Sequence, residues 1–255
     1  MPNCNICQAP TREAFRHQIR DRHLITYFHC SQCGFLQTEE PFWLTEAYER
    51  PINVSDTGYV SRNVYLARRT LGLFFFLFKA SDTFLDYAGG YGLLTRLMRD
   101  YGLNFLWTDP YTPNLFAQGF EYHGEKIAAL TCFECFEHFS QPLAEIEQLL
   151  KISDTIFFST KVLPATLPDG NWDYYGFNHG QHLSFYSIKS LQCIARKYGL
   201  TYYTDGANLH LFTRQSWPRP LVRALLTLSR LPLEPLFKRR RGSLTDRDHR
   251  VLLKS

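Results

Sequence analysis

The sequence feature that most restricts how this 255-residue chain folds is a set of two Cys-x-x-Cys motifs close to its N-terminus. Cys4 and Cys7 form the first motif, and Cys30 and Cys33 form the second, with 22 residues between them. Two thiolates on one tight turn bind the same ion, and two such turns complete the tetrahedral sulfur site of structural zinc. Gly34 follows the second motif, where such a turn favours a residue that tolerates positive φ. We therefore predict a zinc ribbon, because a segment of about 45 residues buries too little apolar surface to fold without a metal ion or another cross-link.

The three remaining cysteines show no such arrangement. Cys132 and Cys135 form a third Cys-x-x-Cys motif at the end of an apolar run, but no partner pair accompanies it, and Cys193 stands alone. We interpret all three as small core residues. Paired cysteines in a chain of this kind indicate metal chemistry in a reducing compartment rather than structural disulfides.

Charge and hydropathy exclude several classes of protein. The net charge is +4, which is too small to require a nucleic acid as partner. The longest unbroken apolar run comprises residues 71–78, which is far below the roughly 20 residues that span a bilayer. The first residues lack the basic-then-apolar pattern of a signal peptide. We therefore expect a cytoplasmic protein without a transmembrane segment, and the sequence leaves its oligomeric state open.

The order of apolar patterns predicts an α/β fold. Residues 1–50 are expected to form the ribbon module, residues 51–216 a second domain and residues 217–255 a basic extension. A helix over 58–79 precedes alternating short strands and helices, which is typical of a mostly parallel sheet covered on both faces, with an antiparallel strand at its end. The expected strands are 83–87, 104–108, 127–133, 155–159, 202–204 and 209–213, and the expected helices are 91–101, 142–150 and 188–198.

The C-terminal extension is rich in proline and ends in basic residues that include Lys238, Arg239, Arg240 and Arg241. Two interpretations remain open for it. One is a solvated, mobile tail. The other is an amphipathic, basic surface element that contacts a membrane or a polyanion.

A glycine-rich turn follows the first expected strand of the sheet and reads Asp86-Tyr87-Ala88-Gly89-Gly90-Tyr91-Gly92. A cofactor that lies across the carboxyl ends of parallel strands needs backbone without Cβ atoms. Asp109 ends the next strand, where a carboxylate accepts hydrogen bonds from both hydroxyls of a ribose. Dinucleotide-binding enzymes use the same arrangement, so these residues alone leave the cofactor open.

These motifs resemble those of class I S-adenosylmethionine-dependent methyltransferases. Asp86-x-Ala88-x-Gly90-x-Gly92 is similar to their first motif, Asp/Glu-x-Gly-x-Gly-x-Gly, with Ala88 in place of the first glycine. Residues 130–139, 157–160 and 180–187 resemble the later motifs of ubiquinone-type and sugar methyltransferases, some of which carry a similar zinc-binding module. The resemblance covers about residues 58–214 and implies a Rossmann-like, seven-stranded sheet.

The resemblance also implies roles for single residues. Asp86 and the turn Ala88, Gly89, Gly90 and Gly92 would bind the methionine end of S-adenosylmethionine. Asp109 would bind its ribose, and Phe133 would lie beside the sulfonium. The implied reaction is methyl transfer to a hydroxyl of a small molecule, sugar or glycan.

A second group of polar residues surrounds the strand that ends near Phe133. Glu134, Glu137 and His138 follow this strand, and His182 lies in a later loop. Four such side chains suit Mg²⁺ or Mn²⁺, and a similar set binds metal in small-RNA 2′-O-methyltransferases. A histidine, His138 or His182, acting as general base without metal, and a purely structural role at a helix start, are the alternatives.

Other functions compete with methyl transfer. The ribbon and the basic extension also fit an RNA-binding protein or an RNA methyltransferase, and the glycine turn fits a nicotinamide-dependent oxidoreductase. Ala88 is the one residue that favours a non-catalytic scaffold. The aromatic loop over residues 172–180 is expected either to cover the site and stack on the acceptor or to pack as an ordinary surface loop.

Overall fold

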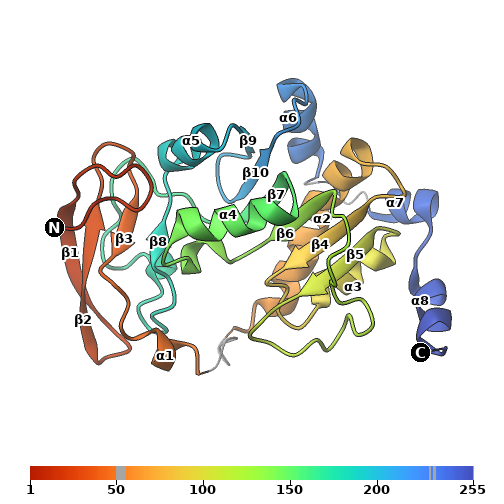
Figure 1. Cartoon of the computed structure of the whole chain (residues 1–255), viewed down its shortest axis with the longest axis horizontal. Helices are drawn as coiled ribbons and strands as arrows, with labels where there is room; N and C mark the ends of the chain where they lie inside the picture. The colour runs from red at the N-terminus through yellow and green to blue at the C-terminus, as the bar shows by residue number, and fades with distance from the viewer. Residues whose placement is uncertain (50–55, 230, 232–233, 255) are drawn as a thin grey trace. The chain divides into compact units, whose positions relative to one another are not determined.

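The computed structural model describes residues 1–49, 56–229, 231 and 234–254 (Figure 1). The chain forms two compact units, each built from three stretches of sequence. Unit 1 comprises Met1–Asn53, Phe133–Lys151 and Phe158–Gln215, and unit 2 comprises Val54–Cys132, Ile152–Phe157 and Ser216–Ser255. Each unit therefore brings together residues that are far apart in sequence.

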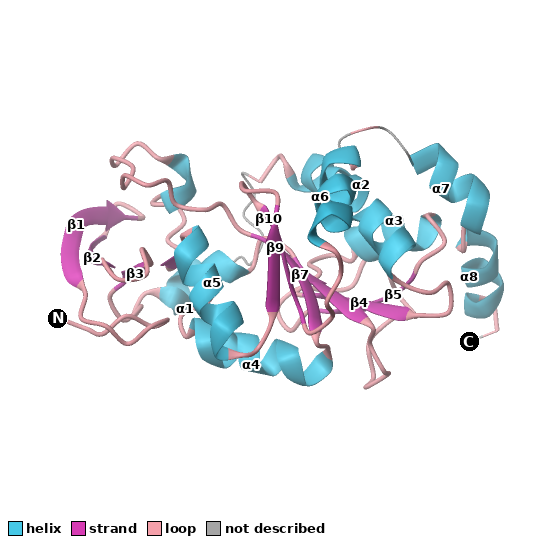
Figure 2. Ribbon diagram, turned by 90° about the horizontal axis from the view of Figure 1, so that it is seen from above, coloured by secondary structure: helices cyan, strands magenta, loops and turns pink. Residues whose placement is uncertain are grey.

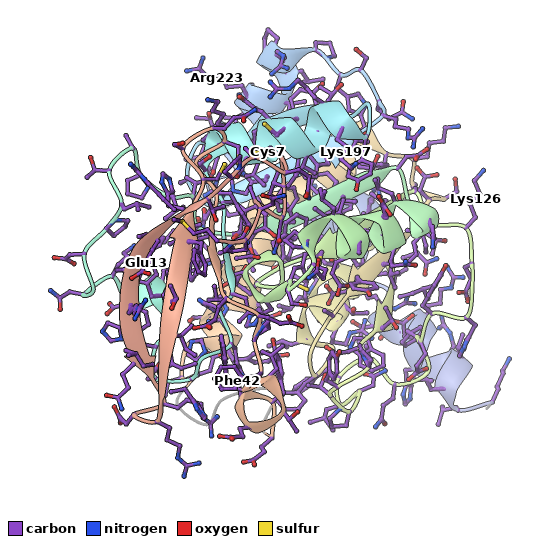
Figure 3. The ribbon with its side chains drawn as sticks, turned by 60° about the vertical axis from the view of Figure 1, so that its left-hand side comes forward. Cys7, Glu13, Phe42, Lys126, Lys197 and Arg223 are labelled. Carbon is purple, nitrogen blue, oxygen red and sulfur yellow. The ribbon has the colours of Figure 1, made fainter. Side chains whose placement is uncertain are left out.

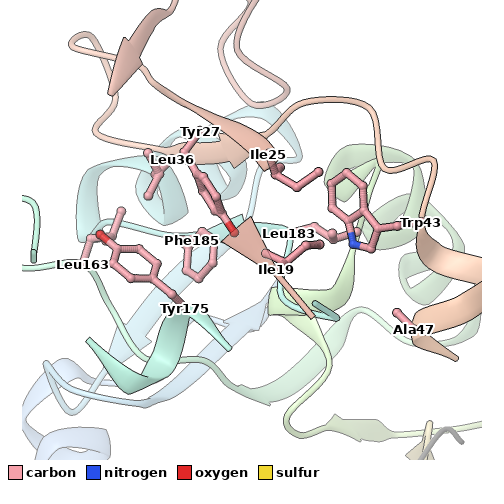
Figure 4. Packing of buried hydrophobic residues seen from close by; sticks show 10 residues of the cluster. All are labelled: Ile19, Ile25, Tyr27, Leu36, Trp43, Ala47, Leu163, Tyr175, Leu183 and Phe185. Atoms are coloured by element: carbon pink, nitrogen blue, oxygen red, sulfur yellow. The ribbon is translucent and has the colours of Figure 1, made fainter. Parts of the chain in front are cut away.

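Unit 1 contains an antiparallel sheet with the strand order β1-β2-β3-β8. The strands are β1 (Arg12–Ile19), β2 (His23–His29), β3 (Leu36–Thr38) and β8 (Ser184–Phe185). Alternate residues of β2, Ile25 and Tyr27, are buried, because a strand points successive side chains to opposite faces. Figure 4 shows the core that receives them. Its buried members are Ile19, Ile25, Tyr27, Leu36, Trp43, Ala47, Leu163, Tyr175, Leu183 and Phe185.

The rest of unit 1 is built from short helices and one hairpin. A capping box begins the helix α5, because Ser187 and Ser190 each accept a backbone N–H of the other. β9 and β10 pair antiparallel. The elements are α1 (Leu44–Ala47), η1 (Phe136–His138), α4 (Pro142–Ile152, whose last residue falls in unit 2), η2 (Asp173–Tyr175), α5 (Ile188–Lys197), β9 (Thr201–Thr204) and β10 (Leu209–Thr213).

Unit 2 places helices against parallel strands. β4 (Thr83–Tyr87) pairs in parallel with β5 (Asn104–Thr108) and with β6 (Ala129–Cys132). The helices α2 (Tyr59–Leu77) and α3 (Leu93–Asp100) contact each other. Aromatic rings fill the space between α2 and the strands, and those of Phe74, Phe84, Phe105 and Phe157 lie with centroids 4.6–5.3 Å apart.

The main sheet has the strand order β5-β4-β6-β7-β10-β9, and β7 (Thr155–Ser159) contributes residues to both units. It is mostly parallel with an antiparallel pair at one end, so the predicted Rossmann-like α/β fold is confirmed. This main sheet has six strands within the described residues, instead of the seven that the resemblance implied. The seventh segment makes only one parallel bridge, Trp107 with Glu121, because Gly119 and Gly124, both with positive φ, interrupt the extended backbone on either side.

The C-terminal extension is folded, which corrects the interpretation as a mobile tail and leaves that of an amphipathic, basic surface element open. It forms α6 (Arg219–Leu228), α7 (Glu234–Arg241) and α8 (Thr245–Leu252). Figure 2 shows α6 and α7 beside α2, in agreement with the contacts between these helices. The guanidinium of Arg99 in α3 donates two hydrogen bonds, of 2.8 and 2.6 Å, to the carboxylate of Asp248 in α8, and both residues are buried. Such a pair has no local sequence signature.

Of the three cysteines expected in the core, Cys132 is buried, whereas Cys135 and Cys193 are only partly buried. The prediction that all three are core residues is therefore confirmed for Cys132 and wrong for Cys135 and Cys193. Among the helices of the described residues, none combines the length and the apolar character that a membrane crossing requires.

Candidate functional site

The four N-terminal thiols of unit 1 converge. The sulfur atoms of Cys4 and Cys33 lie 3.5 Å apart, as do those of Cys7 and Cys30, and all four sulfurs lie within 4.8 Å of one another. Contact with the thiol of Cys33 lowers the pKa of Cys4 to about 5. One member of the set is thus already disposed to be a thiolate, which is the form that binds metal. Figure 3 labels Cys7 among the side chains of this unit.

Two turns of the same geometry carry these thiols. The amide of Gln8 donates to the carbonyl of Cys4 (2.9 Å), and the amide of Gly34 donates to the carbonyl of Cys30 (2.8 Å). Gln8 and Gly34 both have positive φ, 61° and 73°. A Cβ on Gly34 would lie 2.9 Å from the hydroxyl oxygen of Ser187, which begins α5. The glycine expected after the second motif is therefore required both by its backbone angle and by this close approach.

The glycine-rich turn of unit 2 is organised around a buried carboxyl group. Asp86 is only 2% exposed, and its two oxygens accept hydrogen bonds from the hydroxyls of Thr131 (2.8 Å) and Thr95 (3.3 Å). Burial raises the pKa of Asp86 to about 7. A Cβ on Gly89 would lie 2.7 Å from Asp86 Oδ2 and 2.8 Å from the indole of Trp107. The backbone of the turn therefore packs directly against this carboxyl group, and only glycine fits at position 89.

Two further hydrogen bonds hold the turn in place. Gly90 donates its amide to Asp109 Oδ2 (2.9 Å) and accepts the indole N–H of Trp107 at its carbonyl (2.9 Å). Ala88, where the resembling family has glycine, adopts a left-handed φ of 54°. The structure thus explains the usual glycine at this position and shows that alanine is accommodated there at the cost of backbone strain.

Asp109 is half-buried and both of its oxygens are already used. Oδ2 accepts the Gly90 amide, and Oδ1 accepts the amides of Tyr111 (2.8 Å) and Thr112 (2.9 Å). A carboxylate oxygen has more than one lone pair, so ribose hydroxyls can be added to this pattern. Phe133 is partly buried and directly follows β6. Its contact with a sulfonium stays a prediction.

One residue at the turn escaped the sequence analysis. Tyr59, the first residue of α2, accepts the amide hydrogen bond of Tyr91 at its hydroxyl oxygen (3.0 Å), and the two rings pack edge to face. Burial, with the nearby Asp86 and Asp109, raises the pKa of Tyr59 to about 12. The helical spacing of apolar residues over 58–79 indicates only that Tyr59 packs against neighbouring elements. No local motif distinguishes it from the other apolar residues of the helix.

The second group of polar residues, in unit 1, is brought together in part. One oxygen or nitrogen of Glu137, His138 and His182 lies within 4.8 Å of the others. Glu137 and His138 belong to η1, and His182 immediately precedes Leu183 and β8. We call these three residues the Glu-His cluster. Local sequence predicted the first two as neighbours, whereas the third arrives from 44 residues further along the chain.

Hydrogen bonds orient both imidazoles of the Glu-His cluster. His138 Nδ1 lies 3.1 Å from the carbonyl oxygen of Gln181, and His182 Nδ1 lies 2.6 Å from the carbonyl oxygen of Tyr174. A carbonyl only accepts, so His182 Nδ1 carries the hydrogen and its Nε2 keeps a lone pair. His138 Nδ1 also lies 3.0 Å from the hydroxyl oxygen of Tyr48, so the orientation of that hydroxyl decides which nitrogen of His138 carries the hydrogen. A backbone carbonyl behind a histidine is the usual support of a metal ligand, and the same tautomer suits a general base.

The carboxyl group of the Glu-His cluster lacks a complete set of partners. Glu137 is 1% exposed, and no described residue forms a hydrogen bond with its Oε2. Burial and the neighbouring Glu134 raise the pKa of Glu137 to about 8. Burial lowers the pKa of His138 to about 4 and that of His182 well below its usual value. All three groups are thus disposed to be neutral at neutral pH.

Glu134, the fourth member expected from the sequence, does not join the cluster. Its Oε1 accepts the hydroxyl of Ser159 (2.6 Å), and its amide donates to the same hydroxyl oxygen (2.7 Å). The backbone of Glu134 is left-handed, with φ 51°, which turns its side chain toward β7. The hydroxyl that holds it comes from a distant strand, so the spacing of the acidic residues could not reveal it.

The aromatic loop over residues 172–180 packs largely into its own unit. Tyr175 is 1% exposed and belongs to the core in Figure 4. The hydroxyl of Tyr174 lies 3.0 Å from that of Thr160 and accepts the amide of Lys161 (2.9 Å). Tyr175 is therefore not available to stack on an acceptor, and Tyr174 serves the site through the carbonyl that orients His182.

Comparison of the sequence with known families gives one match. The family model described as a methyltransferase domain matches residues 59–204. This range begins at the tyrosine that supports the glycine turn and ends with β9. No curated protein matches the sequence.

Several solved structures are similar in fold. CalO1, a methyltransferase in calicheamicin biosynthesis in an SAH-bound form, has 13% identity and a TM-score of 0.46 over 63% of this chain and 55% of its own. An O-methyltransferase family protein from Burkholderia thailandensis has 15% identity and a TM-score of 0.42 over 69% and 68%. The plantazolicin methyltransferase BpumL, in complex with a substrate analogue and SAH, has 13% identity and a TM-score of 0.45 over 69% and 94%. This chain thus spans little more than half the length of CalO1.

Proposed function

This chain belongs to the methyltransferase domain family. From that premise we propose that it is an S-adenosylmethionine-dependent enzyme that methylates a hydroxyl of a small molecule, sugar or glycan. The observation that carries the choice of a hydroxyl is the Glu-His cluster, in which two imidazoles converge with a buried carboxyl group. A hydroxyl acceptor must lose a proton during transfer, and a neutral imidazole is the side chain best suited to take it near neutral pH.

The turn that follows β4 is the proposed cofactor site. Gly89, Gly90 and Gly92 present backbone that a nucleoside can approach closely, and Asp109 offers oxygens for the ribose hydroxyls. Asp86 and Ala88 shape this turn, so they belong to the site as well. The turn is already held by hydrogen bonds within unit 2, which supports a preorganised site that loses little entropy on binding.

Methyl transfer itself is a displacement at carbon. The acceptor oxygen forms a bond to the methyl carbon, the bond from that carbon to the sulfonium breaks, and its electron pair stays on the sulfur of the thioether product. The hydroxyl proton moves to Nε2 of His138 or His182. Correct alignment of oxygen, carbon and sulfur supplies most of the acceleration in such a step.

The donor set of the Glu-His cluster also fits a divalent ion. Two imidazoles and one carboxylate leave coordination positions open, and imidazole favours transition ions such as Mn²⁺ over Mg²⁺. Glu137, His138 and His182 would hold this ion, which would lower the pKa of a bound hydroxyl. Glu134 was expected among the ligands, but its bond with Ser159 favours a supporting role.

The cysteine cluster fits structural zinc. Four thiols converge from two matching turns, and four thiolates are the donor set of a closed, tetrahedral structural zinc site. The free thiols of the described residues also agree with a reducing compartment, which supports cytoplasmic localisation. The boundaries near residues 50 and 216, which separate the ribbon, the catalytic domain and the extension, remain part of this proposal.

The function is tested by transfer assays with labelled S-adenosylmethionine. The acceptors are nucleotide sugars, glycans, quinol precursors and RNA, each with and without a chelator followed by Mn²⁺. We expect label on a hydroxyl of one of the small molecules or glycans. Label on RNA alone would replace the proposed acceptor class, and full activity after complete removal of divalent ions would leave the histidines as the general base without metal.

A further inference from the structure

The C-terminal helices of unit 2 carry a charge opposite to that of the rest of the chain. Residues 217–255 contain ten Lys and Arg against three Asp and Glu, whereas the preceding 216 residues contain 18 and 21. The modest overall charge of +4 therefore conceals a strongly basic segment on a weakly acidic protein. Charge separation of this kind directs a protein toward an anionic surface.

Large apolar side chains are exposed at the ends of α2 and α6 and just after α6. Phe76 near the end of α2, Leu228 at the end of α6 and Leu231 after it are 56%, 49% and 54% exposed. All three line one open hollow, together with the buried Leu225 and Phe237. Exposed apolar residues that gather around one hollow are unusual on a protein surface that faces only water.

Basic side chains follow directly on one of the helices that line this hollow. α7 lines it with Glu234 and Phe237, and the next residues of the same helix, Lys238, Arg239 and Arg240, are all exposed. Apolar side chains at the rim and cations beside them form the combination by which a helix rests on a membrane surface. We call this set, Phe76, Leu228, Leu231, Lys238, Arg239 and Arg240, the C-terminal face.

The C-terminal face is fixed to a packed scaffold. The ring of Phe237 lies 4.7 Å from that of Phe75, and Arg241 donates to the carbonyl oxygens of Phe75 and Phe78 at the end of α2. Further along, Arg99 and Asp248 join α8 to α3. The helices α7 and α8 are thus fixed to α2 and α3 by buried contacts, and binding through α7 needs no refolding.

We propose that the C-terminal face docks this protein on an anionic lipid bilayer. The basic residues attract the lipid headgroups, and Phe76, Leu228 and Leu231 enter the boundary between headgroups and acyl chains. Protruding leucines distinguish this face from one that binds RNA, because nucleic acids reward stacking aromatics and a groove of cations rather than aliphatic side chains. The association is peripheral and reversible.

The test is flotation of the full-length, zinc-loaded protein with vesicles of phosphatidylcholine alone or mixed with phosphatidylglycerol. We expect binding only to the mixed vesicles, and weaker binding as salt rises. The variant K238Q/R239Q/R240Q should bind about 100-fold more weakly, since each basic residue near a membrane contributes about fivefold. The variant L228S/L231S should lose binding at high salt, where the apolar contribution remains.

Matched controls separate docking from general surface effects. K126Q/K151Q/K197Q removes three exposed lysines that lie outside the C-terminal face, and Phe42→Ser removes an apolar side chain that is 67% exposed in unit 1; Figure 3 labels Lys126, Lys197 and Phe42. Both should bind like the original protein. Equal losses in test and control variants, binding to RNA but not to vesicles, or no binding to mixed vesicles by protein with a normal melting temperature would each overturn the proposal.

Discussion

The glycine turn of unit 2 and the Glu-His cluster of unit 1 differ in whether their polar groups already have hydrogen-bond partners. In the turn, every polar group discussed above has a partner within the unit: Gly90 donates to Asp109, and Asp86 accepts the hydroxyls of Thr95 and Thr131. In the cluster, Glu137 Oε2 is buried without a hydrogen bond from any described residue, and an atom of each imidazole lies within 4.8 Å of its carboxyl group. A buried polar atom without a partner costs about 1–3 kcal/mol. The turn is therefore preorganised without a ligand, whereas the cluster is stabilised when an ion or a substrate binds.

The largest expected effect separates the two sites by function. His182→Asn removes the lone pair at Nε2 but keeps a polar side chain of similar reach. We expect methyl transfer to fall at least 100-fold, because general-base or metal catalysis contributes about that much, while S-adenosylhomocysteine affinity stays within about twofold. Transfer assays and calorimetry measure the two quantities.

A matched variant sharpens this first prediction. His179→Asn changes a neighbouring imidazole that accepts the amide of Gln181 and lies outside the group of converging atoms. It should retain most of the activity. If His179→Asn and His182→Asn lose activity equally, the Glu-His cluster is not the reacting centre.

The second prediction is the opposite case, in which a substitution in the glycine turn lowers cofactor affinity. Gly89→Ala inserts a Cβ 2.7 Å from Asp86 Oδ2 and 2.8 Å from the Trp107 ring, so the turn must shift. We expect S-adenosylhomocysteine affinity to fall at least tenfold and the free energy of unfolding to drop by about 1–3 kcal/mol. Gly124→Ala is the control for crowding, because its Cβ meets no atom within 4 Å; its positive φ adds a backbone strain that Gly89→Ala does not have. Unchanged affinity in Gly89→Ala would show that the turn does not contact the cofactor.

The third prediction concerns pH. Burial raises the pKa of Asp86 from 3.8 to about 7, so between these values the folded state holds a proton that the unfolded state has released. The free energy of unfolding therefore falls as pH rises from about 4 to 7, by an amount on the order of a few kcal/mol, and the decline ends above pH 7. Urea unfolding across this range measures it.

Asp86→Asn provides the comparison for that titration. The amide cannot ionise, so the slope of stability against pH should become shallower by the contribution of one proton. An identical slope in both proteins would show that Asp86 keeps an ordinary pKa, and that its burial is relieved by water.

The smallest expected effect is at Ala88. Its left-handed φ of 54° costs an alanine about 1 kcal/mol, but glycine also gains entropy in the unfolded chain. Ala88→Gly should therefore change the free energy of unfolding by less than about 1 kcal/mol and leave cofactor affinity unchanged. A gain in affinity would mean that the methyl group of Ala88 occupies space that the ligand needs.

Local patterns predicted much of the fold. The strands 83–87, 104–108, 155–159 and 209–213 match the structure residue for residue. A short apolar run bounded by turn residues is a local sequence signal for a strand. The C-terminal helices were not predicted as packed elements, since their prolines and arginines suggested exposure. What holds them is Phe237 against the α2 aromatics and Arg99 against Asp248, both contacts between distant residues.

The candidate sites divide in the same way. Spacing alone identified the cysteines and the glycine turn, because each is a local motif. The exclusion of Glu134 depended on a hydroxyl from β7, and the support of Tyr91 by Tyr59 depended on the start of α2. Hydrogen bonds between distant segments leave no periodic trace in a sequence, so these contacts emerge only from the folded chain.

The most direct test of the central claim is calorimetric titration of the zinc-loaded, full-length protein with S-adenosylhomocysteine, alongside Gly89→Ala and His182→Asn. We expect saturable binding at one site per chain, a marked loss in Gly89→Ala and none in His182→Asn. Absence of binding heat in correctly folded protein, or equal affinity in all three proteins, would contradict the assignment of the glycine turn as the cofactor site.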